Sequence, residues 1–399
     1  MTAVAEELLL ARAAWSRLTE PADVVAGAVV AALGPVPALE LVRETARTGA
    51  AAVGPRAGEV LPGSARAVQR LTTALERWCP RLETLDAARE LDRHRARGGD
   101  LLVPEDARWP AGLDDLGAEA PHALWVSGAV AALGSAADGV AVIGARACTH
   151  YGEHVTAEVA AGVVAAGRVV VSGGAYGIDA AAHRAALAAD GVTLAVLAGG
   201  VDRLYPAGNA RLLLALAEEG GALLSEVPPG SVPSRRRFLQ RNRLIAALTG
   251  ATVVVEAAWR SGALSTAARA AALLRPVGAV PGPVTSAASA GCHRLLRDGV
   301  AVCVTDAAEV LELLRGGAAT DGRAAAGPPG REVTDGLDEA ARQVLDALPV
   351  RAWAQVASVT RVAGVSGAQA RGALGLLELA GLAQRRGETW RRVSSGRSG

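Results

Sequence analysis

The sequence predicts an α/β protein built on a doubly wound parallel sheet. Apolar strands alternate with helices through the middle of the 399-residue chain, a pattern typical of a parallel sheet covered by helices. Several of these strands run directly into loops that contain glycine. Helical segments precede this part of the chain, and helices with a strand pair follow it. We therefore expect a smaller domain on either side of the sheet.

Residues 1–98 are expected to form a helical domain. Their apolar residues recur at helical spacing, and Gly34-Pro35 and Pro62-Gly63 mark breaks between helices. Residues 33–39 join two short helices. Such a hairpin either contacts a nucleic-acid backbone or only packs against its neighbours, and the sequence leaves both alternatives open.

Residues 99–316 carry the alternating pattern. The expected strands are short and apolar, and they cover 140–143, 168–172, 193–197, 222–225, 251–256, 277–280 and 301–304. The expected helices cover 151–166, 178–189, 207–219, 240–248, 263–273 and 306–314. The carboxyl ends of parallel strands share one edge of the sheet, where open α/β sheets bind their ligands.

Residues 317–336 are expected to be a flexible linker, because they are rich in glycine, alanine and proline and have no apolar period. Residues 337–399 then show helical segments over 337–348, 353–362 and 366–380 and a strand pair over 382–393. This is the outline of a winged helix. Its third helix has Arg371 as its only cation, so it suits protein docking at least as well as DNA reading.

Composition excludes several classes of function. The chain has no lysine, which rules out a P-loop, the strand lysine of a kinase and Schiff-base chemistry. Its net charge is +1, so any electrostatic binding site must be local. The four cysteines form no CxxC pair, Glu6 and Glu7 precede any basic residue, and apolar runs such as 24–33 are too short to span a bilayer. We expect a cytoplasmic protein that does not bind a membrane.

The stretch 169–179 is the most informative motif. Three valines lead into Ser172, Gly173 and Gly174, and an alanine-rich segment follows Gly177. This pattern predicts a buried strand, a tight loop and a helix. Glycines allow positive φ angles, and the N–H groups of such a loop, together with the helix N-terminus, form a concave site for an anion. A plain strand-to-helix turn is the alternative.

Similar loops recur along the expected edge. Gly144-Ala145-Arg146, Gly199-Gly200, Ser261-Gly262 and Pro281-Gly282 also follow expected strands, and repeated phosphate-sized sites indicate a polyanion. Five arginines crowd into 235–243 beside Phe238, the only phenylalanine of the chain. Guanidinium groups beside an aromatic ring suit a single-stranded nucleic acid, with a solvated basic loop as the alternative.

No catalytic motif is convincing. The dinucleotide pattern G-x-G-x-x-G is absent. Residues 150–154 match the H-x-x-E-H pattern of zinc proteases, but they straddle a loop-to-helix junction and lack a third ligand. There is no G-x-S-x-G elbow, and Ser172 has no evident partners for hydrolysis. We expect no catalytic residue, no metal and no cofactor.

From about residue 104 to 304 the chain resembles the DNA-processing protein A (DprA, or Smf) family. The resemblance rests on motifs in the family's order: Ile143-Gly144-Ala145-Arg146, Ser172-Gly173-Gly174-Ala175-Tyr176-Gly177-Ile178-Asp179, Ala198-Gly199-Gly200-Val201-Asp202, Arg241-Asn242-Arg243, Ser261-Gly262-Ala263 and Pro281-Gly282. Three positions depart from the family pattern. Ala145 stands where a hydroxyl residue is usual, Leu239 where proline is usual, and His293 where asparagine is usual.

The resemblance implies an extended Rossmann-like fold, with an N-terminal domain of the SAM or helix-hairpin-helix type and a C-terminal winged helix. It also implies a homodimer that binds single-stranded DNA and loads RecA recombinase during natural transformation, with single-strand-binding protein as a further partner. The expected DNA-binding residues are Gly144, Arg146, Ser172, Gly173, Gly174, Ala175, Gly177, Arg237, Phe238, Arg241, Asn242, Arg243, Ser261 and Gly262.

Two other functions remain open. Glu256, Ser261-Gly262 and Thr266 loosely match the acid and phosphate loop of Rossmann-like enzymes that cleave the N-glycosidic bond of nucleoside monophosphates, although the full pattern is missing. A transcription factor that reads duplex DNA through the winged helix is the third interpretation.

Overall fold

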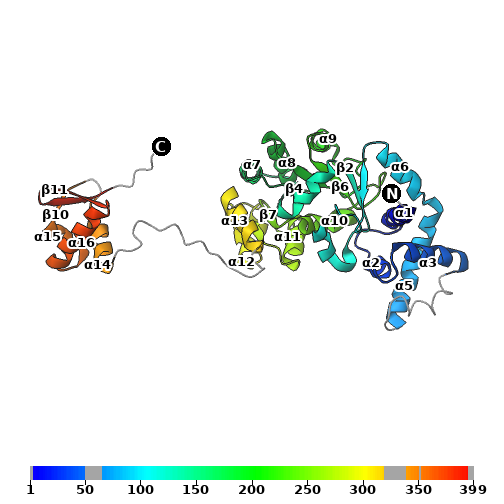
Figure 1. Ribbon diagram of the computed structural model, residues 1–399, viewed down its shortest axis with the longest axis horizontal. Helices are drawn as coiled ribbons and strands as arrows, with labels where there is room; N and C mark the ends of the chain where they lie inside the picture. Colours follow the sequence, from blue (N-terminus) through cyan, green and yellow to red (C-terminus); the bar gives the residue numbers. More distant parts are fainter. Residues whose placement is uncertain (1–2, 50–64, 319–337, 350–351, 394–399) are drawn as a thin grey trace. The chain divides into compact units, whose positions relative to one another are not determined.

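The computed structural model describes residues 3–49, 65–318, 338–349 and 352–393 (Figure 1). The chain divides into two compact units, 1–322 and 323–399.

A nine-stranded sheet forms the centre of the first unit, in the order β1-β2-β6-β5-β4-β3-β7-β8-β9. The strands are β1 Asp100–Leu102, β2 Leu124–Gly128, β3 Val140–Ile143, β4 Val170–Ser172, β5 Thr193–Val196, β6 Ala222–Ser225, β7 Ala251–Val254, β8 Val277–Ala279 and β9 Val302–Cys303. β1 pairs antiparallel with β2 and β2 with β6, whereas all other neighbours are parallel. The predicted parallel sheet is confirmed for β3 to β9, whereas β1 and β2 add an antiparallel edge that was not predicted.

The chain reverses its direction across the sheet between β3 and β7. It moves outward from β3 through β4 and β5 to β6, then returns to β7 on the other side of β3 and continues to β8 and β9. Such a switch point leaves a crevice at the carboxyl ends of the two central strands. The topology therefore places the loops after β3 and β7 at a position suited to a ligand.

Helices cover both faces of the sheet. α7 His150–Ala165, α8 Ile178–Ala188, α9 Ala210–Glu218 and α13 Ala307–Ala318 pack on one face, whereas α10 Arg235–Leu248, α11 Ala263–Ala272 and α12 Ala290–Arg297 pack on the other. Successive side chains of β3 point to opposite faces of the sheet. Val142 packs in the core beneath α7, α8 and α13, and Ile143 packs in the core beneath α10, α11 and α12.

The structure differs from the expected elements at four places. β1, β2 and α12 were not predicted, because each is short and β1 and β2 pair outside the parallel pattern. α10 begins at Arg235 rather than at residue 240, because the Ser234 side chain caps it by accepting from the Arg237 N–H at 3.3 Å. The first arginines of the basic cluster thus lie on a helix and not in a loop.

The N-terminal helices pack around two tryptophans. They are α1 Ala3–Leu18, α2 Val24–Leu33, α3 Pro35–Thr48, α5 Ala65–Trp78, the 3-10 helix η2 Cys79–Thr84 and α6 Ala87–Arg95. The rings of Trp15 and Trp78 meet edge to face with centroids 5.4 Å apart. The indole N–H of Trp125 in β2 donates to Ser16 Oγ at 3.1 Å and so ties α1 to the sheet. These helices therefore belong to the same compact unit as the sheet.

Within the described ranges, no helix alone has the length and apolar character that a bilayer crossing needs; α2 and α3 meet that test only as a pair bent by 115°.

The second unit contains the elements that the sequence predicted near the C-terminus. α14 Glu339–Ala347, α15 Val356–Ala363 and α16 Gly367–Leu379 enclose a small core with β10 Ala354–Gln355, β11 Ala383–Arg386 and β12 Thr389–Arg392. Ser366 and Gln369 form a capping box at the start of α16. The predicted linker, 317–336, lies outside the described residues except for the end of α13.

A buried neutral histidine predicts sensitivity of this fold to acid. His183 in α8 bonds through Nδ1 to Thr193 Oγ1 at 2.7 Å, and Thr193 itself donates to Val170 O, so His183 is the donor. Burial, with the charges of Arg241 and Arg184, lowers the pKa of His183 from 6.5 to about 3. Below pH 6.5 the unfolded chain gains a proton that the folded protein excludes. The free energy of unfolding therefore decreases as the pH is lowered, by about 1.3 kcal/mol from pH 7 to pH 5.5.

Urea unfolding at these two pH values checks the effect, with His183→Gln as the comparison. The variant keeps a donor for Thr193 but does not titrate in this range, so it should lose less stability on acidification than the parent. Equal losses in both proteins would show that other groups cause the pH dependence.

Candidate functional site

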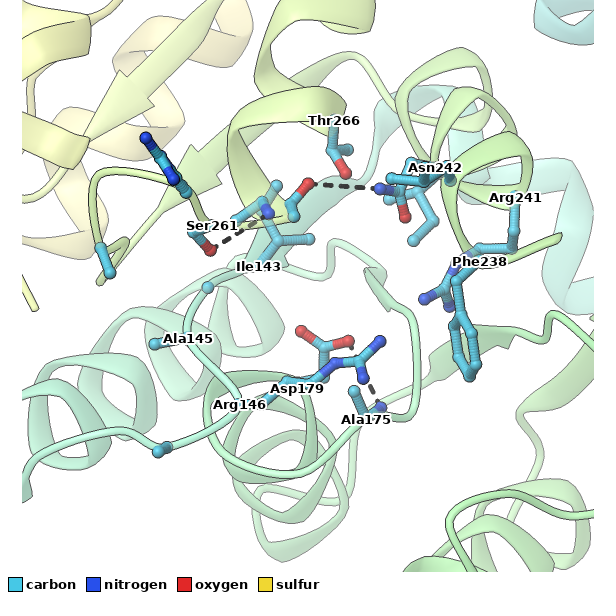
Figure 2. A pocket seen from close by; sticks show the side chains of 18 residues that line it. Ile143, Ala145, Arg146, Ala175, Asp179, Phe238, Arg241, Asn242, Ser261 and Thr266 are labelled. Carbon is cyan, nitrogen blue, oxygen red and sulfur yellow. Dashed lines mark hydrogen bonds between the residues drawn. The ribbon is translucent and has the colours of Figure 1, made fainter. Parts of the chain in front are cut away.

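Two adjoining pockets open at the carboxyl edge of the sheet, next to the switch point. We call them the inner pocket, of about 450 Å³, and the outer pocket, of about 880 Å³, and together the groove. The inner pocket lies between the loops after β3 and β7 and the first turns of α10 and α11 (Figure 2). Both pockets share Arg146, Phe238, Leu239, Arg260, Ser261 and Gly262.

The glycine loop at 172–177 supports the groove but does not form the expected anion site. Ser172 is fully buried and its hydroxyl donates to Val142 O at 2.7 Å. The carboxylate of Asp179, in the first turn of α8, accepts from the Ala175 N–H at 3.4 Å. Burial raises the pKa of Asp179, and the nearby charge of Arg241 opposes this. The carboxylate of Asp179 takes the place that a bound anion would have in this loop. The prediction of an anion site at 172–177 is therefore corrected.

Glycine is required at two positions of this loop. A Cβ on Gly173 would collide with the guanidinium of Arg241. Gly177 has φ +75°, and a Cβ there would strike the carbonyl oxygen of Ala145. Gly144 packs in the same way against Ile178, and Gly174 has φ +69°. These glycines shape the floor of the site, and of residues 172–177 only Ala175 lines the inner pocket.

Arg241 lines the inner pocket from below. Its side chain is nearly buried, and Nη1 donates to Gly173 O at 2.7 Å and also to Val196 O. Burial lowers the pKa of Arg241 to about 10, so the group stays charged at neutral pH. Its Nε–H is buried without a partner in the described part of the chain.

Two other expected phosphate ligands bind carboxylates of the protein itself. Arg243 is 0% exposed, and its guanidinium donates two hydrogen bonds to the Glu226 carboxylate, at 2.9 and 2.6 Å. Arg237 donates to both carboxylate oxygens of Glu20, at 3.0 and 3.1 Å. Neither residue lines either pocket. The structure therefore places Arg237 and Arg243 apart from the groove.

The groove instead carries arginines that have no carboxylate partner among the described residues. They are exposed and lie on four different segments: Arg146 after β3, Arg203 after β5, Arg235 in α10 and Arg260 after β7. Sequence reasoning found Arg146 but did not select Arg203 and Arg260, because each is a single arginine in a loop. Only the fold brings them together.

An aromatic pair lies between these arginines. The rings of Phe238 and Tyr205 have centroids 5.7 Å apart, and the guanidinium carbon of Arg146 lies 4.8 Å from the Phe238 centroid. Tyr205 is half exposed, as is the neighbouring Leu239. The sequence did not identify Tyr205 as a site residue, because its position beside Phe238 depends on the sheet order.

The opposite wall is formed by the loop after β7. Ser261 Oγ accepts from the Ala263 N–H at 3.3 Å, and Asn242 donates to Gly262 O at 3.3 Å (Figure 2). A Cβ on Gly262 would meet nothing within 4 Å, so the groove is open there. Ser261, Gly262 and Asn242 thus lie where the sequence placed them.

Two groups that the enzymatic alternatives need, Glu256 and His154, are engaged elsewhere, whereas Ser261, Gly262 and Thr266 line the inner pocket. Glu256 is buried and accepts from the N–H and hydroxyl of Thr149, at 2.9 and 2.6 Å, and it lines neither pocket. His154, of the H-x-x-E-H pattern, pairs with Glu158 at 3.3 Å. Across the described ranges no three potential ligands lie close enough to hold a metal ion.

Residues 100–315 match the family model described as DNA recombination-mediator protein A. The chain belongs to this family. It is 44% identical over 398 residues to the putative DNA processing protein DprA of Mycobacterium tuberculosis, covering 96% of this chain and 95% of that protein. It is 43% identical over 197 residues to protein Smf of Escherichia coli, covering 49% of this chain and 52% of that protein.

The same family appears among solved structures. The chain is similar to DNA processing protein A of Streptococcus pneumoniae, with a TM-score of 0.54 and 32% identity, over 66% of this chain and 92% of that one. The resemblance identified from the motifs is thus confirmed, and this DprA-family chain is a DNA-processing protein. The assignment of individual binding residues stays a prediction.

The two kinds of arginine predict different effects of substitution. Arg243→Ala would leave the Glu226 carboxylate buried without its partner, so the free energy of unfolding should fall by about 3–5 kcal/mol. Arg146→Ala removes an exposed side chain and should change stability by less than about 0.5 kcal/mol. Urea unfolding of both variants checks this. Equal stability of the two would contradict a structural role for Arg243.

Proposed function

We propose that this DprA-family chain binds single-stranded DNA in the groove. The observation that carries the proposal is the set of four exposed, uncompensated arginines around the Phe238–Tyr205 pair. Guanidinium groups hold phosphates, and aromatic faces accept unstacked bases of any sequence. Family membership and the position at the switch point support the same function.

Within the groove we assign roles by position. Arg146, Arg203, Arg235 and Arg260 contact phosphates, and Phe238 and Tyr205 stack against bases. Asn242, Ser261 and Gly262 line the opposite wall. Gly144, Ser172, Gly173, Gly174, Ala175 and Gly177 shape the site, while Arg241 and Asp179 hold its floor. Arg237 and Arg243 contribute to the fold and receive no phosphate in this proposal.

Replacing Arg146 and Arg260 together by alanine should weaken binding of oligo(dT) and of mixed-sequence oligonucleotides alike, because phosphate contacts carry no base information. If four phosphates are neutralised, log K against log salt should have a slope of about −3 in the parent and about −1.5 in the double variant. Fluorescence anisotropy at several salt concentrations measures both slopes.

Arg168→Ala is the matched control, because Arg168 precedes β4 at the opposite edge of the sheet and pairs with Asp138. It removes one arginine charge, one fewer than the double variant, and should leave both slope and affinity unchanged. A groove variant that binds single strands as well as the parent does would reject the groove.

We also propose that the protein acts by binding and not by catalysis, as a dimer that loads RecA recombinase on single strands, with single-strand-binding protein as a further partner. Two grooves in one dimer would bind one strand more tightly than a single groove, since the second contact is intramolecular. The proposal includes a winged-helix assignment for residues 337–399 and an N-terminal helical domain over 1–98 that packs against the sheet within the first compact unit.

Light scattering should then give twice the monomer mass, and the full-length protein should speed growth of RecA filaments on strands coated with single-strand-binding protein. The Arg146/Arg260 double variant should remain a dimer but lose this effect. A monomer that leaves filament growth unchanged would contradict the loading role, even if DNA binding were observed.

A further inference from the structure

The second compact unit has a cationic surface of its own. β11 and β12 form a hairpin with four arginines, Arg385, Arg386, Arg391 and Arg392, against one acidic residue, Glu388 in the turn. The whole chain has almost no net charge, so this density is local. We call these residues, 383–392, the arginine hairpin.

The strand register separates the two faces of the arginine hairpin. Arg386 lies opposite Thr389, and Arg385 lies opposite Trp390. Side chains alternate along a strand, so Arg386 and Arg391 share the face that points away from Trp390. Trp390 is buried in the core of this unit. Arg386 and Arg391 therefore lie on the outer face, diagonally across the strand pair and about 7–8 Å apart at the backbone.

No carboxylate neutralises this outer face within the described part of the unit. Arg391 donates to Gln384 Oε1 at 3.2 and 2.8 Å and lies 4.8 Å from the centroid of Trp353, and both partners are uncharged. Arg386 is exposed and has no side-chain partner there. Arg392, which shares the face of Trp390, pairs with Asp346 at 3.5 Å, so this carboxylate does not belong to the outer face.

The helix that usually reads DNA in a winged helix has the opposite character here. α16 exposes Leu376 and Leu379 and carries Arg371 as its single cation. A base-reading helix needs polar side chains that reach base edges, and α16 offers few of them. In this unit the positive charge is on the hairpin and not on the helix.

We propose that the outer face of the arginine hairpin binds the phosphate backbone of double-stranded DNA without sequence preference. Arg391 lies over one face of the Trp353 ring, and phosphates are suited to the two guanidinium groups of the outer face. Duplex DNA is favoured over a single strand because it carries one charge per about 1.7 Å of its axis. This contact is separate from the groove and does not depend on it.

The test uses the full chain with Arg386→Ala and Arg391→Gln combined, and a mixed-sequence duplex as the probe. Loss of two phosphate contacts should lower duplex affinity about tenfold at low salt and reduce the slope of log K against log salt by about 1.8. Binding of an oligo(dT) of about eight nucleotides, which we assign to the groove, should not change.

Arg361→Ala with Arg371→Ala is the matched control, since it removes the same charge from the helices of the same unit. Unchanged duplex binding in the hairpin variant, or an equal loss in the control, overturns the proposal. Duplex binding that disappears only with Arg146→Ala and Arg260→Ala would place the duplex in the groove and also overturn it, without affecting the groove proposal.

A gain-of-function variant keeps the test decisive if the double substitution unfolds the unit. Glu388→Gln removes the only acidic group of the hairpin and leaves the core untouched. It should raise duplex affinity severalfold and steepen the salt slope. No increase would count against the proposal.

Discussion

A buried guanidinium holds the carboxyl edge of the sheet together. From α10, Arg241 donates to the carbonyl oxygens of Gly173, in the loop after β4, and of Val196, at the end of β5. A charge removed from water requires such partners, so the loop cannot move away without a large energetic cost. The same contact explains why residue 173 must be glycine. The groove depends on this anchor, since Arg241 also forms part of its floor.

The arginines of α10 have divided roles because of helical geometry. Arg237 and Arg241 are one turn apart, and both turn toward protein partners, a carboxylate of the N-terminal helices in one case and backbone carbonyls in the other. Arg243 is directed into the interior and pairs with Glu226. Arg235 remains exposed at the helix start. A cluster that is uniform in sequence is therefore largely structural, and the available positive charge is supplied by loops from elsewhere.

The sequence was sufficient for the parallel strands of the sheet, the switch-point loops and the family, because alternating apolar strands and glycine-bearing turns are local patterns. It did not predict the antiparallel strands β1 and β2. It also located Arg146, Phe238, Asn242 and Ser261-Gly262 in the groove. It could not distinguish a buried arginine from an exposed one, since the carboxylates that bind Arg237 and Arg243 come from distant segments. Arg203, Tyr205 and Arg260 were missed for the same reason. The Asp179 carboxylate in the glycine loop shows that a loop of suitable sequence can be filled by its own chain.

Hydrogen–deuterium exchange on the full chain, with and without a saturating single-stranded oligonucleotide, tests the central claim most directly. Exchange reports protection segment by segment and so locates the bound strand without any substitution. If the strand binds in the groove, amide exchange should be slower with the oligonucleotide in 144–147, 203–206, 232–239 and 258–262. Exchange should not change around Glu226 or at the opposite edge of the sheet near Arg168. Protection confined to other surfaces, with these four segments unchanged, would contradict the account.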